Sequence, residues 1–399
     1  MSLQNFKQEY ILSYQEIYQK VLVGKAIASM RFQSNLKFGE SVTRTQMDIS
    51  AVKVRDITIL QDRTVDSLSD SEELLTINYH KGTTFPLSTK EKIQAGPLSP
   101  AQYAGAKVAY KTATAVDADI LFETTNGFST FDTGDLTTLA STGVPITLNS
   151  TTVPQMVSRM PAKLRKNNQI LTNMALVIDS YGASDITQYL MGKQIDNSLA
   201  VFKNGYSGPI SSGAELYVSE NLTGEAVLAL ATQPTANDTV VINGLTFTFV
   251  ATPSAEGDID LGGDVDATRA NLAAALNQGA GAGSAYIAFT GNDLETLDEL
   301  NVTATNDDTA NTLTVVCRGS GRLTVSETLT NGTDEWSKNF IHAYFGKKGA
   351  IEVVMQEEVD MEMREEPKQR TTNIMSDALY GIKTFNDGAQ QFVDVHIAA

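Results

Sequence analysis

The chain has 399 residues, 42% of them hydrophobic, which is enough for two or three domains with a substantial core. No apolar run approaches the length of a membrane span, so we expect no membrane contact, and we expect no signal peptide. The single cysteine rules out an internal disulfide, and three histidines far apart in sequence (His80, His342 and His396) leave little material for metal or acid–base chemistry.

The N-terminal part predicts a helix and then a long hairpin. Apolar and aromatic residues recur at helical spacing over 6–22, which fits either a core helix or an arm that docks onto a neighbour. Residues 51–60 and 74–80 mix β-branched and polar residues as half-buried strands do, and the acidic stretch 66–73 is too polar to enter a core. A solitary hairpin is poorly stable in water, so we expect a neighbouring copy of the chain to cover it.

Two helices are predicted next. Pro97 and Pro100 introduce residues 101–123, a run rich in Ala, Lys and Leu that predicts a helix roughly 35 Å long. Residues 153–166 predict a second helix, which Pro161 should kink or split.

Shorter elements follow these helices. Residues 175–179 predict a buried strand, residues 184–190 predict a short helix with Ser184 as its N-cap, and residues 215–219 predict a strand after glycine-rich turns.

A segment without a single lysine spans 222–335, inside a chain that uses lysine freely elsewhere. It holds 16 acidic residues against 3 arginines, and so carries −13 of the net charge of −17. This change in composition predicts a separate domain. Its acidity favours a solvated outward surface and argues against nucleic-acid contact, because phosphate binding needs Lys and Arg.

The acidic segment predicts a compact, mostly β module. Asn243-Gly244 between the apolar halves of 240–250 is a strong hairpin signal, and residues 266–277 predict a helix with a capping aspartate. Further strands are expected at 285–289, 313–317 and 323–329.

The C-terminal part predicts a long strand and a closing hairpin. From 351 to 363, apolar residues take six of the seven odd positions and most even positions are acidic or polar, which is typical of a strand with one acidic face. Residues 378–385 and 391–397 are expected to pair as a hairpin across 386–389.

No catalytic constellation stands out. The sequence has no phosphate-binding glycine loop, no histidine pair at metal spacing and no nucleophile elbow, so we predict no enzyme activity and no cofactor. Cys317 and His342 lie among apolar residues and are expected to be structural. Four aspartates around a Gly-Gly pair form a weak calcium candidate, and the alternative is a solvated loop that ends in a helix cap. These candidate ligands are Asp258, Asp260, Asp264 and Asp266.

The order of these elements resembles the major capsid protein of tailed bacteriophages, the Hong Kong 97 fold. The hairpin at 41–90 is similar to the extended E-loop, and the helix that ends with Ala-Val-Asp-Ala-Asp-Ile-Leu at 115–121 is similar to the spine helix. The stretch 204–222 resembles the glycine-punctuated turn and strand of the axial domain. Residues 343–354, with the alternating strand and closing hairpin after them, resemble the family's C-terminal part.

The resemblance implies an α+β fold with a mostly β domain inserted between the strand at 215–222 and a partner strand near 337. It divides the chain into an N-terminal arm at 1–40, an E-loop at 41–95, a peripheral domain with the spine helix at 96–175, the first part of an axial domain at 176–221, an acidic inserted domain at 222–335, and closing axial and peripheral strands at 336–399.

The resemblance also implies a function. Copies would assemble as hexamers and pentamers into an icosahedral head shell, which encloses phage double-stranded DNA without sequence specificity. The expected partners are other copies of the chain, a separate scaffolding protein, a portal and a possible decoration protein. The expected location is the virion, after assembly in the host bacterial cytoplasm.

Two other functions fit part of the sequence. An encapsulin-like compartment shell would use the same fold around a cargo enzyme, and a phage tail or surface adhesin would use the β-rich acidic module for binding. The adhesin does not account for the long hairpin and the spine-like helix.

Overall fold

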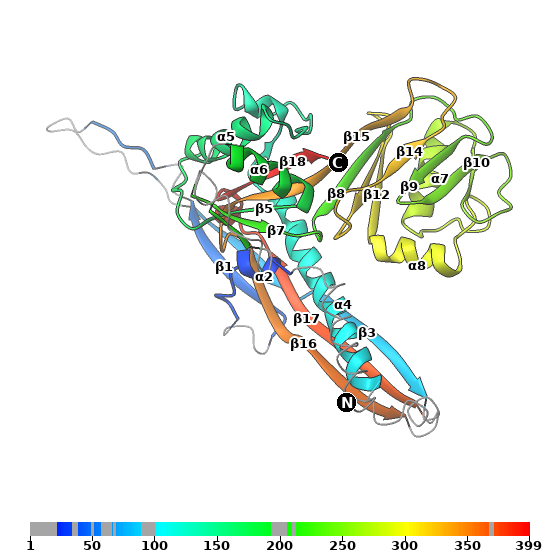
Figure 1. Cartoon of the computed structure of the whole chain (residues 1–399), viewed down its shortest axis with the longest axis horizontal. Coiled ribbons are helices and arrows are strands. Elements are labelled where there is room, and N and C mark those ends of the chain that lie inside the picture. Colours follow the sequence, from blue (N-terminus) through cyan, green and yellow to red (C-terminus); the bar gives the residue numbers. More distant parts are fainter. Residues whose placement is uncertain are drawn as a thin grey trace.

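The computed structural model describes residues 22–33, 39–48, 52–56, 66, 69–88, 100–192, 206–209, 213–366 and 371–399. Over these residues the chain mixes helices and sheets in two lobes and an elongated arm (Figure 1). The helix expected at 6–22 lies outside the described residues. None of the described helices is long and apolar enough to cross a membrane.

The described helices and strands have the following bounds. The helices, with two 3-10 turns, are α2 Gly24–Ile27, α4 Pro100–Phe122, η1 Glu123–Asn126, η2 Thr133–Leu136, α5 Thr152–Lys166, α6 Ser180–Gly192, α7 Val265–Leu276, α8 Gly291–Leu300 and α9 Asn386–Ala389. The strands are β1 Ser41–Asp48, β2 Ser69–Thr76, β3 Tyr79–Ser88, β4 Thr130–Phe131, β5 Met174–Ile178, β6 Tyr206–Pro209, β7 Glu215–Val218, β8 Thr223–Ala229, β9 Thr239–Ile242, β10 Leu245–Val250, β11 Asp258–Asp260, β12 Val302–Asp307, β13 Thr312–Cys317, β14 Val325–Glu327, β15 Glu335–Lys347, β16 Glu352–Glu366, β17 Thr371–Lys383 and β18 Phe392–Ala398.

A nine-stranded sheet runs through both lobes in the order β12-β13-β8-β15-β5-β7-β6, and β18 and β4 join it at β15. The long strand β15 connects the lobes, because its residues 335–342 pair with β8 and its residues 344–347 pair with β5. The expectation that the strand at 215–222 pairs with residues near 337 is wrong, since β7 lies between β5 and β6. Continuous backbone pairing therefore joins the acidic segment to the rest of the molecule.

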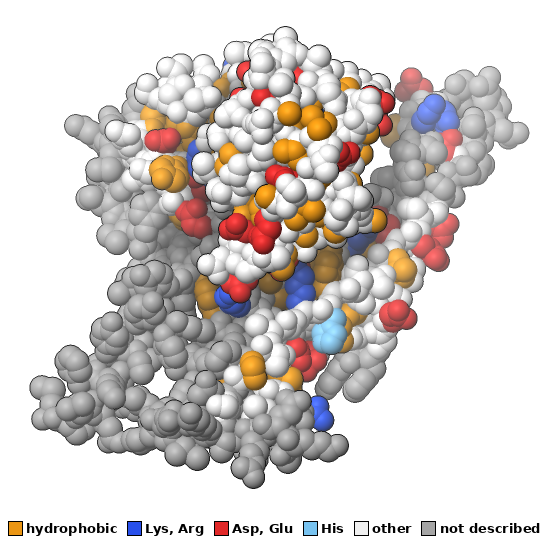
Figure 2. Space-filling view, turned by 90° about the vertical axis from the view of Figure 1, so that its right-hand side faces the viewer, with side chains coloured by type: hydrophobic (Ala, Val, Ile, Leu, Met, Phe, Trp, Pro, Cys, Tyr) orange, Lys and Arg blue, Asp and Glu red, His pale blue; other side chains and the backbone are white. Residues whose placement is uncertain are grey.

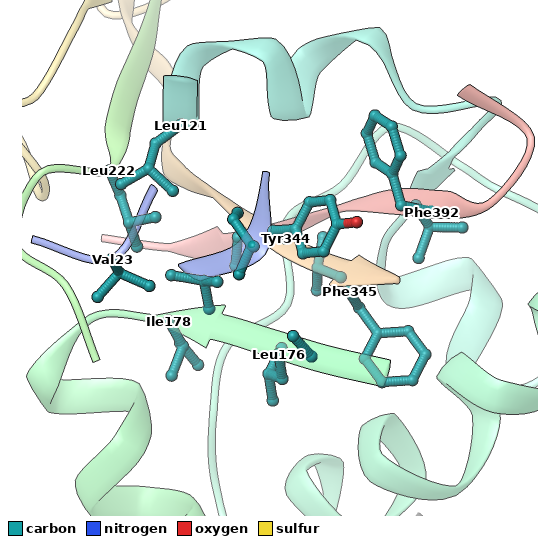
Figure 3. Close-up of a cluster of buried hydrophobic side chains, with 14 of the residues drawn as sticks. Val23, Leu121, Leu176, Ile178, Leu222, Tyr344, Phe345 and Phe392 are labelled. Carbon is teal, nitrogen blue, oxygen red and sulfur yellow. The ribbon is translucent and has the colours of Figure 1, made fainter. Parts of the chain in front are cut away.

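Each lobe has its own hydrophobic core. The larger core surrounds β5, whose run Met-Ala-Leu-Val-Ile is buried along its whole length, as a central strand covered on both faces requires. Figure 3 labels its members Val23, Leu121, Leu176, Ile178, Leu222, Tyr344, Phe345 and Phe392. The second core forms inside the acidic segment, around Phe247, Phe249 and Leu272.

The arm is a three-stranded sheet of β16, β17 and β3, with α4 packed against all three strands (Figure 1). The helix expected at 101–123 is α4, and the strand expected from the alternation at 351–363 is β16, so both predictions are confirmed. The alternation fails near the start of β16, where Glu352 is buried beside apolar neighbours. The register between β16 and β17 is also irregular between Met355 and Asp360.

The predicted hairpin is formed by other residues than the ones expected. Strand β1 pairs with β2, from Ser41 opposite Thr76 to Asp48 opposite Ser69, so most of the acidic stretch 66–73 belongs to a strand. Polar residues are compatible with this strand because most of its described side chains face solvent. The expected strand at 51–60 is not found over 52–56, and 57–60 lies outside the described residues.

The closing hairpin expected at 378–385 and 391–397 is wrong. Strand β17 pairs with β16 and β3, whereas β18 pairs with β15 and β4, and Asn386–Ala389 forms the short helix α9 between them. Ala378, Tyr380 and Ile382 share the main core with Phe392, and Phe385 packs in a small cluster with Leu75 and Val354, so burial in one core does not make the two segments pair. The two segments therefore serve different sheets.

Two helices also differ from their predictions. Helix α5 is continuous through Pro161, which is buried among the apolar residues of its inner face, so tertiary packing outweighs the lost backbone hydrogen bond. Helix α6 begins at Ser180, and Asp179 accepts a hydrogen bond from the amide of Gly182, so Asp179 and not Ser184 caps its N-terminus. The predicted strands at 175–179 and 215–219 are confirmed as β5 and β7.

Inside the acidic segment, the Asn-Gly hairpin is confirmed. Asn243 and Gly244 have φ angles of 48° and 87°, the left-handed pair that a tight turn between β9 and β10 needs. The strand at 313–317 is confirmed as β13, and 323–329 is a strand only over β14. The strand expected at 285–289 is absent from this described region apart from single bridges at Tyr286. Strands β8 and β12 and helix α8 were not predicted.

Candidate functional site

The end of helix α4 is the point where four parts of the chain meet. Asp117 is almost fully buried there and accepts hydrogen bonds from the amides of Val23 and Gly24, at 2.9 and 2.5 Å. Its other oxygen accepts a hydrogen bond from the side chain of Asn221, at 2.8 Å. One carboxylate therefore ties α4 to the start of α2 and to the residues before the acidic segment.

Asp119, two residues further along α4, is also buried and holds a second set of elements. Its Oδ2 lies 2.6 Å from Nζ of Lys81 on β3 and accepts a hydrogen bond from the hydroxyl of Tyr380 on β17, at 2.5 Å. Burial and the charge of Asp119 both raise the pKa of Tyr380, so the phenol stays protonated and donates. Asp119 therefore fixes α4 against two strands of the arm.

The loop 318–322, Arg-Gly-Ser-Gly-Arg, docks the acidic segment against the end of α4. The guanidinium of Arg318 lies 3.8 Å from the ring centre of Phe122, and Nη1 of the same arginine lies 3.7 Å from Oδ1 of Asp119. Gly319 has a φ of +75°, and a Cβ on it would come within 2.6 Å of Cβ of Ala118. Glycine is required here both by backbone conformation and by the close approach of the helix.

Arg322 closes the other side of this docking loop. Its Nε lies 2.5 Å from Oδ2 of Asp179, and its Nη1 donates a hydrogen bond to the carbonyl oxygen of Ala398, at 2.8 Å. Asp179 is the residue that caps α6. Arg322 therefore links the acidic segment to a helix and to the last strand of the main lobe.

The basic residues of the acidic segment are thus used mainly for docking. Of its three arginines, Arg318 and Arg322 contact the main lobe, while Arg269 is buried within the segment beside Asp266. Figure 2 looks onto the segment and shows more acidic than basic side chains on its outer face. This distribution leaves an acidic outer surface and a cationic attachment point.

The root of the β1–β2 ribbon is anchored as well. Arg44 on β1 makes a two-pronged ion pair with Asp387 of α9, at 2.7 and 2.5 Å, and lies over the ring of Phe385. This hydrogen bonding raises the pKa of Arg44 and lowers that of Asp387, so both groups are charged at neutral pH. On β2, Glu73 accepts a hydrogen bond from the amide of Asn386.

The four aspartates of the weak calcium candidate do not converge. Asp258 and Asp260 accept hydrogen bonds from the amides of nearby turns, Asp264 caps α7 through the amide of Ala267, and Asp266 pairs with Arg269. All four are described residues, and no three of them bring an oxygen within 4.8 Å of one another. Their roles are those of the alternative, a loop that leads into a helix cap.

A different cluster was not predicted from the sequence, because its members come from separate strands. Among the described residues, His342, Asp394 and His396 bring three possible metal ligands within 4.8 Å of one another. Burial by itself lowers the pKa of His342, but the charges and hydrogen bonds of Asp394 and Glu225 outweigh it and raise the pKa to about 10.

Cys317, in contrast, is a structural residue among apolar neighbours, as predicted from the sequence. It is fully buried at the end of β13, and burial raises its pKa to about 12, which confirms the expectation of a small buried residue.

Comparisons with known proteins find similarity at the level of solved structures. No protein-family model and no curated protein matches the chain. A chain of Mycobacterium phage Che8 aligns at 13% identity and a TM-score of 0.46, covering 94% of this chain and 92% of that chain. The capsid structure of the cyanophage P-SCSP1u aligns at 9% identity and a TM-score of 0.47, with 96% and 89% covered. The mature capsid of bacteriophage PhiM1 aligns at 11% identity and a TM-score of 0.44, with 90% and 82% covered.

These neighbours are phage structures, and two of the three are named as capsids, the class of protein that the sequence resembles. Because every TM-score is below 0.5, the case for a function rests on the elements of the chain itself.

Proposed function

We propose that the chain is the major capsid protein of a tailed bacteriophage, with a Hong Kong 97 type of fold. Copies assemble through hexamers and pentamers into an icosahedral shell that encloses double-stranded DNA. The role is structural and non-enzymatic, and the protein is located in the virion after assembly in the host bacterial cytoplasm.

The exposed ribbon of β1 and β2 is the observation that carries this proposal. Among the described residues these two strands pair only with each other, and most of their described side chains are exposed, including Leu74 at 51%. A two-stranded ribbon is marginal in water unless it packs on something else. Its root is nevertheless held firmly, by Arg44 and by the buried Leu75. Such a ribbon is suited to lie on a second copy of the chain.

The joint at Asp117 and Asp119 supports the same proposal. It fixes the start of α2, the arm and the acidic segment to one helix end, so that each has a defined direction. Subunits that form a closed shell must present their contact surfaces at fixed angles. When the rotation between neighbouring subunits does not close, the product is a filament and not a closed particle.

The proposed division of the chain follows the resemblance. Residues 1–40 are an N-terminal arm, 41–95 an E-loop, 96–175 a peripheral domain, 176–221 and 336–399 an axial domain with closing peripheral strands, and 222–335 an inserted domain. The acidic outer face of the inserted domain favours a position outside the shell, away from the DNA. A separate scaffolding protein, a portal and a decoration protein complete the proposed partners.

Negative-stain electron microscopy with sedimentation of the purified chain tests the proposal. Closed particles of uniform diameter, or rings that close into them, are expected, and particles from infected cells should contain DNA. Closed particles that contain a cargo protein and no DNA would indicate an encapsulin-like shell. A chain that stays monomeric with and without a scaffolding protein would contradict both shells and favour a tail component or adhesin.

A further inference from the structure

The cluster of His342, Asp394 and His396 is built by strand pairing. His342 on β15 stands directly opposite His396 on β18, and Asp394 lies two residues before His396. Directly paired residues and residues two apart share one face of a sheet, so the three side chains meet on the same side. The arrangement is therefore fixed by two strands of the central sheet and not by a loop.

The distances within the cluster are slightly shorter than those between the ligand atoms of an occupied metal centre. Oδ2 of Asp394 lies 2.7 Å from Nδ1 of His342 and 3.0 Å from Nε2 of His396. Zinc ligands stand about 2.0–2.2 Å from the ion, which places tetrahedral ligand atoms roughly 3.3 Å from one another. A small movement of these side chains would open the space for an ion between the three atoms.

Glu225 supplies the second feature of such a centre. Its Oε2 lies 3.2 Å from Nε2 of His342, the ring nitrogen that does not face Asp394. Metal-binding histidines commonly donate their other N–H to a carboxylate, which fixes the tautomer and the ring direction. Glu225 holds His342 with Nδ1 turned towards the cluster.

The charge and burial of the cluster favour a divalent cation. Asp394 is 3% exposed, and its second oxygen, Oδ1, is buried without a hydrogen-bond partner among the described residues. Asp394 and Glu225 bring two carboxylates to His342, and a divalent cation would supply the opposite charge that a buried carboxylate needs. His396 and Glu225 keep 12% and 22% of their side chains exposed, which leaves a route of entry.

An apolar wall covers the rest of the cluster. The ring centre of Phe340 lies 4.3 Å from that of His396 and 5.1 Å from that of His342, and Phe340 itself is buried. Such a wall limits the access of water and strengthens the attraction between an ion and its ligands.

We propose that His342, Asp394 and His396 bind a divalent transition-metal ion, for which zinc fits the two nitrogens and one oxygen best. Glu225 is a positioning residue for His342. The ion fastens β18 to β15 and, through Glu225, to β8, the first strand of the acidic segment. Without an ion, the two ring nitrogens of His342 lie at hydrogen-bonding distance from Asp394 and Glu225.

Calorimetric titration of the chelator-treated full-length chain with zinc chloride tests this proposal. We expect saturation at one zinc ion per chain, and a higher thermal unfolding temperature with zinc than without it. His396→Gln should weaken zinc binding at least roughly 10-fold, and Glu225→Gln should weaken it by roughly 10- to 100-fold. The matched control is His80→Gln, because His80 is the third histidine of the chain and is exposed on β3.

Titration with cobalt(II) gives an independent readout, since a tetrahedral cobalt site absorbs strongly in the visible range. The band should form with the wild type and His80→Gln and should be lost in His396→Gln. Absence of saturable binding in the folded wild type would overturn the proposal and leave a proton-linked ion network. Equal zinc affinity in the wild type and in a folded His396→Gln variant would overturn it as well. The outcome is independent of whether shells form.

Discussion

Two buried aspartates, Asp117 and Asp119, set the geometry of the molecule at the scale of single residues. They lie on one turn of α4, yet their partners come from positions as far as 104 and 261 residues away in sequence. A buried carboxylate is stable only when its oxygens are paired. Each of the two aspartates therefore favours the arrangement in which the surrounding elements supply its partners.

Removing one of these carboxylates should be costly. We predict that Asp119→Ala lowers the free energy of unfolding by about 3 kcal/mol, because it leaves Tyr380 without its acceptor and two cations without their counter-charge. Urea unfolding of the unassembled chain measures this. Lys111→Ala is the control, since Lys111 pairs with Glu299 of the acidic segment through side chains that are both about 70% exposed, and should cost less than about 1 kcal/mol. Equal effects would contradict the role of Asp119.

Asp132 provides a pH-dependent test. Burial raises its pKa, but hydrogen bonds from Ser141 and from the amides of Gly143, Thr142 and Gly134 outweigh burial and lower the pKa overall. A lowered folded-state pKa means that stability is present above the unfolded pKa of about 3.9 and is lost as the pH falls through the folded value. We predict that Asp132→Asn costs about 2 kcal/mol at neutral pH.

The difference between wild type and Asp132→Asn should shrink in acid, because below the unfolded pKa the wild-type carboxyl is protonated in the unfolded chain and must release that proton on folding. Urea unfolding at neutral pH and at about pH 3 measures both values. A difference that stays constant over this range would show that the charge of Asp132 contributes nothing.

At the scale of elements, the docking loop 318–322 determines how the acidic segment is held. We predict that Gly319→Ala destabilises this contact by about 1–3 kcal/mol, since its Cβ would overlap Ala118 in a left-handed backbone conformation. Gly332→Ala is the matched control, because a Cβ there meets nothing within 4 Å.

Cys317 reports on this docking, since it is the single cysteine of the chain and lies two residues before Gly319. Its burial and raised pKa should keep it unreactive towards thiol reagents in the wild type. The rate of modification should rise in Gly319→Ala and stay unchanged in Gly332→Ala. Equal rates in the two variants would contradict the docking role of the loop.

The sequence predicts elements better than it predicts their partners. The helix α4, the strand β16 and the Asn-Gly turn follow from periodicity and turn chemistry, which are local properties. The closing hairpin fails because periodicity shows which residues face a core but not with which strand each segment pairs. Phe385 and Phe392 are close in sequence and pack in different clusters.

The candidate sites were predictable only in part. The Asp-containing end of α4 was visible as a motif. The hydrogen-bond and ion-pair partners of its carboxylates are distant in sequence and could not be predicted. The use of Arg318 and Arg322 had one available signal, which is that they flank Gly-Ser-Gly in a segment without lysine. The cluster of His342 and His396 had no local signal, since it depends on the pairing of β15 with β18.

At the scale of the whole molecule, the acidic segment is an addition to a frame that closes without it. Ala229 and Glu335 are directly paired, so residues 230–334 can be replaced by Asn-Gly with a two-residue turn between β8 and β15. Leu228, which loses its cover, is changed to Thr in the same variant. We predict that this chain is less stable, since Asp119 and Asp179 lose arginine partners, but still forms closed shells by electron microscopy. A folded variant that cannot assemble would contradict this.

The β1–β2 ribbon is proposed to make the contact between copies, so a shorter ribbon should prevent assembly. Thr45 and Glu72 are directly paired, so replacing residues 46–71 with Asn-Gly shortens the ribbon and keeps Arg44 and Leu75 at its root. Sedimentation with negative-stain electron microscopy then compares the wild type and this variant under the same assembly conditions. We expect closed shells for the wild type and a folded, unassembled chain with unchanged urea unfolding for the variant. Normal shells from the shortened ribbon would contradict it.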